Sequence, residues 1–167
     1  MNTESRRTTD SVDTASDVLG RYADMVYRLA FARTKSRYDA EDILQEVFLR
    51  YIRHAPECRD EEHRRAWLIR ATINCSKTLL TSAWFRRTVP MEDTLVTEMQ
   101  EKSEVYYAVL ALPARYRTVI HLYYYEDYPV AQIGTLLGCG ESTVKSRLHR
   151  ARKLLRDKLK GEAFDVS

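Results

Sequence analysis

Apolar residues recur at intervals of three and four along most of this 167-residue chain, which is the spacing of one buried face of an α-helix. In the first half, the pattern predicts helices over about 16–35, 39–53 and 64–85. Asp39 is placed to cap the second of these helices, and the polar segment 57–63 predicts a loop before the third. The first half is therefore predicted to be wholly helical.

The helical pattern resumes in the second half after a stretch of weaker periodicity. It predicts short helices over about 101–112, 114–125 and 130–137, and a longer helix over 141–160. Gly138 directly follows the third of these, where a left-handed residue commonly ends a helix. A short helix, a glycine-bearing turn and a longer basic helix are typical of a helix-turn-helix. The predicted fold class is all-α, with two small helical domains joined by a linker.

The ends of the chain and the stretch between its halves lack this pattern. Residues 1–16 are rich in Ser, Thr and Asp, which predicts a disordered tail, and 162–167 form a second tail. The segment 88–101 contains a proline and several acids and is predicted to be a linker. The predicted domains are then 17–87 and 102–161.

The composition narrows the class of protein. Only 5 glycines and 4 prolines occur, which argues against collagen-like, low-complexity and strand-and-turn architectures. The 3 cysteines lie far apart and form no CxxC pair, so a reducing compartment is favoured over a disulfide scaffold. No apolar run approaches the ~20 residues that span a bilayer, and the N-terminal segment has no secretory-signal character. We expect a cytoplasmic protein.

Positive charge is concentrated on the last predicted helix. The whole chain has a net charge of +3, whereas 141–160 has eight basic residues against two acidic ones, a local net charge of +6. An α-helix fits the major groove of DNA, where side chains near its N-terminus reach base edges and others contact phosphates. The base-reading candidates share one face of the helix: Lys145, Ser146, His149 and Arg150. The phosphate candidates are Ser142, Thr143, Arg147, Arg152 and Lys153. A basic helix alone could equally be a solvated face, but the preceding turn unit favours DNA binding.

Three motifs resemble a known family. They are DAEDILQEVFLR at 39–50, AWLIRATIN at 66–74 and TVKSRLHRAR at 143–152. In this order they resemble region 2.2, regions 2.3 and 2.4, and region 4 of the bacterial sigma-70 family, in particular its small extracytoplasmic-function group. The resemblance covers about 18–160. One departure is Gly134, which stands where alanine is usual in the family and costs up to ~1 kcal/mol in helix propensity.

The resemblance implies a promoter-specificity subunit that binds core RNA polymerase. Region 4 would recognise the −35 element of promoter DNA and contact the β flap, whereas region 2 would recognise and melt the −10 element and contact the β′ clamp helices. The residues implied for clamp binding are Asp39, Glu41, Asp42, Gln45, Glu46 and Phe48. From the residues alone, an ordinary amphipathic helix with a solvated acidic face explains this segment equally well.

The third predicted helix has the composition of a surface that binds single-stranded DNA, because its basic side chains are interspersed with aromatic and amide side chains. The residues implied for the −10 element are Arg64, Arg65, Trp67, Arg70, Asn74 and Lys77. For Trp67, packing in the core is favoured over stacking on a base, since it stands between Ala66 and Leu68.

Enzymatic activity and metal binding are not indicated. His54, Cys58 and His63 lack a fourth ligand and match no structural zinc spacing, and no glycine-rich phosphate loop occurs. We therefore expect no catalysis, cofactor, metal or small-molecule substrate. The main alternative function is a conventional dimeric helix-turn-helix repressor or activator that binds a palindrome. The resemblance instead implies a monomer restrained by an anti-sigma factor, which is often membrane-anchored.

Overall fold

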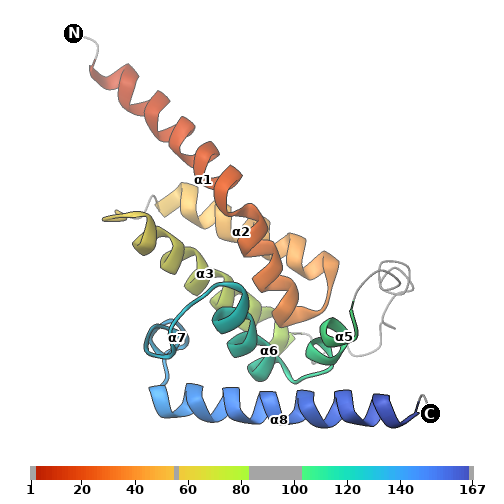
Figure 1. The fold of residues 1–167 in the computed structure, drawn as a ribbon. Helices are drawn as coiled ribbons and strands as arrows, with labels where there is room; N and C mark the ends of the chain where they lie inside the picture. The colour runs from red at the N-terminus through yellow and green to blue at the C-terminus, as the bar shows by residue number, and fades with distance from the viewer. Residues whose placement is uncertain (1–2, 55–56, 83–102, 166–167) are drawn as a thin grey trace. The chain divides into compact units, whose positions relative to one another are not determined.

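The computed structural model describes residues 3–54, 57–82 and 103–165, and every regular element in these ranges is helical (Figure 1). The predicted all-α fold class is confirmed. The chain divides into two compact units, 1–77 and 78–167, so the division falls within a helix, ahead of the predicted boundary at 87. The predicted linker lies outside the described residues, and the domain boundaries stay a prediction.

The first unit is built from three helices: α1 (Thr3–Thr34), α2 (Arg37–His54) and α3 (Glu61–Ser82). α1 and α2 lie side by side (Figure 1). α1 begins at Thr3, which corrects the predicted disordered tail for residues 3–16. Once a helix is nucleated, each further residue adds a backbone hydrogen bond, so a packed helix can extend into a polar segment.

The starts of α2 and α3 differ from the prediction. Ser36 Oγ accepts a hydrogen bond from the backbone N–H of Asp39 at 3.2 Å, so Ser36, and not Asp39, caps α2. Asp60 Oδ1 accepts from the N–H of His63 at 2.7 Å in the same way, so α3 begins within the segment predicted to be a loop. In both helices, the side chain of the residue just before the helix satisfies a free N–H group of the first turn.

Large apolar side chains from all three helices form the core of the first unit. Leu29, Ile43, Leu68 and Ile73 are at most 1% exposed, and burying each stabilises the fold by about 1.5–3 kcal/mol. The buried Arg33 donates from Nε to Ser76 Oγ and ties α1 to α3. With their inner faces occupied, α2 and α3 leave their outer faces to solvent.

The second unit contains four α-helices and a π-helical turn among its described residues: α5 (Glu104–Leu110), α6 (Ala114–Ile120), η3 (His121–Tyr125), α7 (Val130–Leu137) and α8 (Glu141–Asp165). The single helix predicted over 114–125 is thus an α-helix followed by a π-helical turn. α8 packs against α5, α6 and α7, as Figure 1 shows (α8 in blue).

The turn between α7 and α8 depends on two glycines. Gly138 ends α7 in the left-handed conformation, with φ 69° and ψ 35°, as predicted. A Cβ on Gly134 would lie 2.8 Å from the carbonyl oxygen of Cys139. The departure from the family's alanine therefore has a packing reason, because the backbone of this turn passes too close to α7 to admit a side chain.

Candidate nucleic-acid and polymerase interfaces

The base-reading candidates of α8 lie together on its outer face. Lys145, Ser146, His149 and Arg150 are exposed, whereas Val144, Leu148 and Ala151 on the inner face are at most 2% exposed. The buried stripe fixes the rotation of α8 about its axis. As a result, the polar side chains at the start of the helix point to solvent, where a DNA groove could be read.

The phosphate candidates are divided between the edges and the outer face of α8. Ser142, Arg152 and Lys153 are exposed, and Thr143 and Arg147 are half-buried. Arg152 is the most constrained of them, because its Nε donates to the hydroxyl of Tyr124 at 2.8 Å. Its guanidinium also lies 5.5 Å and 5.6 Å from the ring centroids of Tyr123 and Tyr124.

Arg150 is held from a different helix, α6. The hydroxyl of Tyr116 accepts a hydrogen bond from Arg115 at 3.4 Å, and the guanidinium of Arg150 lies near the same hydroxyl. These two cations hold the pKa of Tyr116 below its ordinary value, because they favour the phenolate form. The apolar spacing predicts only an inward-facing position for Tyr116, because a contact with Arg150, 34 positions along the chain, leaves no local signal.

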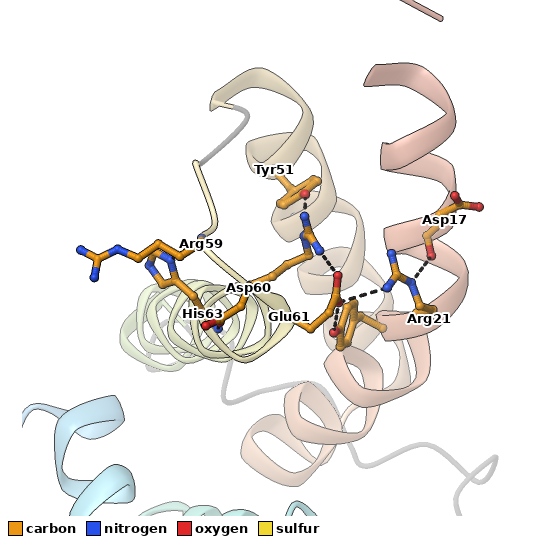
Figure 2. A network of polar contacts seen from close by, with 9 residues as sticks. Asp17, Arg21, Tyr51, Arg59, Asp60, Glu61 and His63 are labelled. Atoms are coloured by element: carbon orange, nitrogen blue, oxygen red, sulfur yellow. Dashed lines mark hydrogen bonds and ion pairs between the residues drawn. The ribbon is translucent and has the colours of Figure 1, made fainter. Parts of the chain in front are cut away.

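The structure gives Arg64 a role within the protein. Its Nε donates to the hydroxyl of Tyr51 at 3.1 Å, and its Nη1 donates to Glu61 (Figure 2). Glu61 also accepts from the hydroxyl of Tyr22 at 2.5 Å and forms an ion pair with Arg21 at 3.1 Å. The hydrogen bond from Tyr22 and the two arginines hold the pKa of Glu61 below its ordinary value. This network, centred on Glu61, joins the start of α3 to α1 and α2.

The other candidates on α3 fall into two groups. Arg70, Asn74 and Lys77 are exposed, and their spacing of four and three residues places them on one outer stripe. Arg65 and Trp67 are half-buried, and the Trp67 ring meets the ring of Tyr51 edge-to-face at 5.7 Å. The contact with Tyr51 agrees with the favoured interpretation of Trp67 as a packing residue.

The polymerase-binding candidates on α2 are mostly on its outer face. Glu41, Asp42 and Gln45 are exposed, and Asp39 and Glu46 are half-buried. Phe48 is only 6% exposed, so the expectation that it contributes to this surface is corrected: it belongs to the core.

Three large side chains that were not predicted to belong to this surface lie on the same outer face of α2. Tyr38, Leu49 and Ile52 are 65%, 43% and 60% exposed. With Glu41, Asp42 and Gln45 they follow the helical repeat along one stripe, so the signal was present in the spacing. We call these six residues the α2 stripe.

Of the three residues considered as metal ligands, His63 makes another contact. His63 Nδ1 accepts a hydrogen bond from the backbone N–H of Arg59 at 3.2 Å (Figure 2). Within 3–54, 57–82 and 103–165, no group of three or more His, Cys, Asp or Glu side chains could hold a metal ion. In the same ranges, no helix combines the length and apolar character required to cross a membrane.

Comparison with known families gives a match to each unit. Residues 18–86 match the family model described as Sigma-70 region 2, and residues 102–155 match the one described as Sigma-70, region 4. The chain belongs to the sigma-70 family. A conventional repressor or activator has no support from these matches, and the expected sigma-factor function is confirmed.

Named relatives of this sigma factor place it in the extracytoplasmic-function group. It is 37% identical over 147 residues to the ECF RNA polymerase sigma factor SigL of Mycobacterium tuberculosis, covering 81% of this chain and 82% of the relative. It is 31% identical over 143 residues to the RNA polymerase sigma factor SigV of Bacillus subtilis, covering 81% and 85%.

Two solved structures share the fold of this sigma factor. The sigma factor RpoE of Bartonella quintana, solved in complex with the anti-sigma factor NepR, matches with a TM-score of 0.66 and 20% identity, over 87% of this chain and 96% of that one. CnrH, solved in complex with the cytosolic domain of CnrY, matches with a TM-score of 0.65 and 21% identity, over 90% and 95%.

Proposed function

We propose that this sigma factor uses three surfaces to direct RNA polymerase to its promoters. The outer face of α8 reads the −35 element, the outer stripe of α3 contacts the opened −10 element, and the α2 stripe binds the polymerase. The observation that carries the proposal is the outward position of Lys145, Ser146, His149 and Arg150 on α8, opposite a fully buried apolar stripe.

For the −35 element, side chains that end in hydrogen-bond donors favour guanine edges and phosphates. Lys145 and Arg150 can donate to the N7 and O6 acceptors of guanine, which is the commonest specific contact in the major groove. Ser142, Thr143, Arg147 and Lys153 lie beside these residues on α8 and would contact phosphates, which position the helix without reading sequence.

For the −10 element, Arg70, Asn74 and Lys77 supply two cations and one amide on a single exposed stripe. Cations that follow a backbone, with groups able to read a base edge, are what an opened strand requires. Arg65 is half-buried on a different side of α3. Arg64 and Trp67 support the stripe from inside, because both contact Tyr51 of α2.

For the polymerase, the α2 stripe combines apolar anchors with acidic and amide side chains. Leu49 and Ile52 stand at its C-terminal end, Tyr38 at its start, and Glu41, Asp42 and Gln45 between them. Exposed apolar groups within a polar border are typical of a protein interface. We assign this surface to the β′ clamp helices, with Asp39 and Glu46 at its edge; region 4 would contact the β flap.

We also propose that an anti-sigma factor restrains this protein. The fold neighbours RpoE and CnrH were solved with NepR and with the cytosolic domain of CnrY, respectively, which supports the expectation by likeness of fold. In this proposal the protein acts in the cytoplasm as a monomer and without catalysis or a cofactor of its own, and the anti-sigma factor is of the membrane-anchored kind.

Reconstitution with core polymerase and a random promoter library tests the proposal. We expect transcripts to start at sites that share a −35 and a −10 element, and an Arg70→Ala plus Lys77→Ala variant to form the holoenzyme but open fewer promoters. Transcription no more specific than that of core polymerase alone would overturn the proposal.

A further inference from the structure

An aromatic and cationic cluster lies on the surface of the second unit, at one edge of the base-reading face of α8. It consists of Tyr123 and Tyr124 from η3 and Arg152 from α8. Arg152 is exposed, and Tyr124 is 52% exposed. Within the described part of the chain, the contacts of the Arg152 guanidinium are all with aromatic side chains, so its charge is not balanced by a carboxylate there.

The π-helical turn brings the two tyrosines to the same guanidinium. Glu126 N–H donates to the carbonyl of His121 at 3.1 Å, five residues earlier, which widens the turn. A wider turn rotates less per residue, so consecutive side chains lie closer together around the axis. His121 Nε2 lies 3.2 Å from Glu126 Oε1, and the ring of Tyr125 stacks on His121 at 5.4 Å; both contacts lie within the turn and hold it in place.

We propose that η3 is part of the promoter interface: Tyr124 positions Arg152, and the two side chains together bind a phosphate of the DNA backbone beside the −35 element. The inference rests on the proposed function of α8. The Tyr124 hydroxyl accepts from Arg152 and keeps its own proton to donate, and among the described residues no acceptor takes that proton. A guanidinium and a hydroxyl fixed side by side offer a phosphate several donors in one geometry.

The position of Arg152 along α8 favours DNA as the ligand. Lys145, His149 and Arg152 follow one another at spacings of four and three residues on one stripe. Seven residues of helix span about 10 Å, and the major groove is about 12 Å wide. A helix whose Lys145 reaches the base edges therefore brings Arg152 to the phosphates at the border of the groove. An acidic protein surface is the other partner that this cluster could take.

The test measures the affinity of the reconstituted holoenzyme for promoter DNA over a range of KCl concentrations, on matched and substituted −35 elements. Arg152→Ala is expected to weaken binding about tenfold on all these sequences and to lower the slope of log affinity against log salt by about one. Tyr124→Phe, which keeps the ring and removes the hydroxyl, is expected to weaken binding about threefold. Its effect should be smaller when it is combined with Arg152→Ala, because only the bond from the hydroxyl to the phosphate is then left to lose.

Two variants serve as matched controls. Tyr125→Phe removes a hydroxyl one residue along η3, and Lys158→Ala removes one positive charge from α8 outside the stripe; both are expected to bind DNA like the unaltered protein. Three results for Arg152→Ala would each overturn the phosphate site. The variant could bind DNA as well as the unaltered protein, lose affinity at one base pair only, or lose affinity for core polymerase in place of affinity for DNA. Failure of the unaltered protein to form a promoter-specific complex would instead overturn the proposed function.

Discussion

Arg64 lies with its Nε 3.1 Å from the hydroxyl of Tyr51, and this contact ties the first turn of α3 to the last turn of α2. Glu61 continues the connection to α1 through Tyr22 and Arg21. The network determines where α3 starts relative to its neighbours, and hence where its outer stripe of Arg70, Asn74 and Lys77 lies.

Because of this network, the protein should lose stability as the pH falls into the acid range. The pKa of Glu61 is lowered from its ordinary value of 4.5, so its stabilising effect is fully present above pH 4.5 and is lost as the pH falls through the lower pKa of the folded state. We expect Glu61→Gln to lower the melting temperature at pH 7, with a difference that shrinks below pH 4.5. Thermal unfolding at a series of pH values measures this, with Glu57→Gln as the control. A difference that is constant across pH would contradict it.

The polymerase-binding surface can be tested at Ile52, which is 60% exposed. Ile52→Ser should leave the free energy of unfolding unchanged within about 0.5 kcal/mol and weaken binding to core polymerase about tenfold, as expected of an apolar anchor. Fluorescence titration with core polymerase measures the affinity. If the variant binds core polymerase as tightly as the unaltered protein, the polymerase-binding surface does not include this end of α2.

Phe48 provides the opposite case on the same helix, because it is 6% exposed. Phe48→Ala should lower the free energy of unfolding by about 3–5 kcal/mol through lost burial and a cavity. Urea denaturation measures the change. A loss of polymerase affinity without a loss of stability would show that the ring does act at the surface.

Gly134 offers a test in which packing opposes helix propensity. Alanine is the better helix former by about 1 kcal/mol, but its Cβ would lie 2.8 Å from the Cys139 carbonyl oxygen. We expect Gly134→Ala to destabilise the protein by about 1–3 kcal/mol. Gly161→Ala, also in a helix but with nothing within 4 Å of its Cβ, is expected to be neutral or stabilising. Equal effects of the two substitutions in chemical denaturation would refute this reason for Gly134.

The contact between Tyr116 and Arg150 predicts a loss of promoter discrimination. Arg150→Ala should cost about 1–3 kcal/mol of binding at a single −35 base pair, and Tyr116→Phe should reduce discrimination at that same base pair by a smaller factor, since Arg150 remains but is less well held. Holoenzyme binding to a set of single-base −35 substitutions measures this. Uniform weakening across the set would make Arg150 a phosphate contact.

The presence of most helices, though not the residues at which they all begin, and the outward face of α8 follow from sequence alone. Each depends on the spacing of apolar residues within one segment, so Val144, Leu148 and Ala151 predict both the helix and the side that Lys145 and His149 occupy. The end of α7 at Gly138 is equally local, because a left-handed residue there needs no distant partner.

Only the tertiary structure decided which polar side chains remain exposed and able to bind DNA or polymerase. Arg64 and Arg70 look alike in the sequence, but Arg64 meets Tyr51 on a neighbouring helix, whereas Arg70 faces solvent. Arg152 likewise meets Tyr124, which is 28 positions away. The physical reason is that helical periodicity describes one helix at a time, whereas hydrogen bonds and ring contacts between helices depend on their packing.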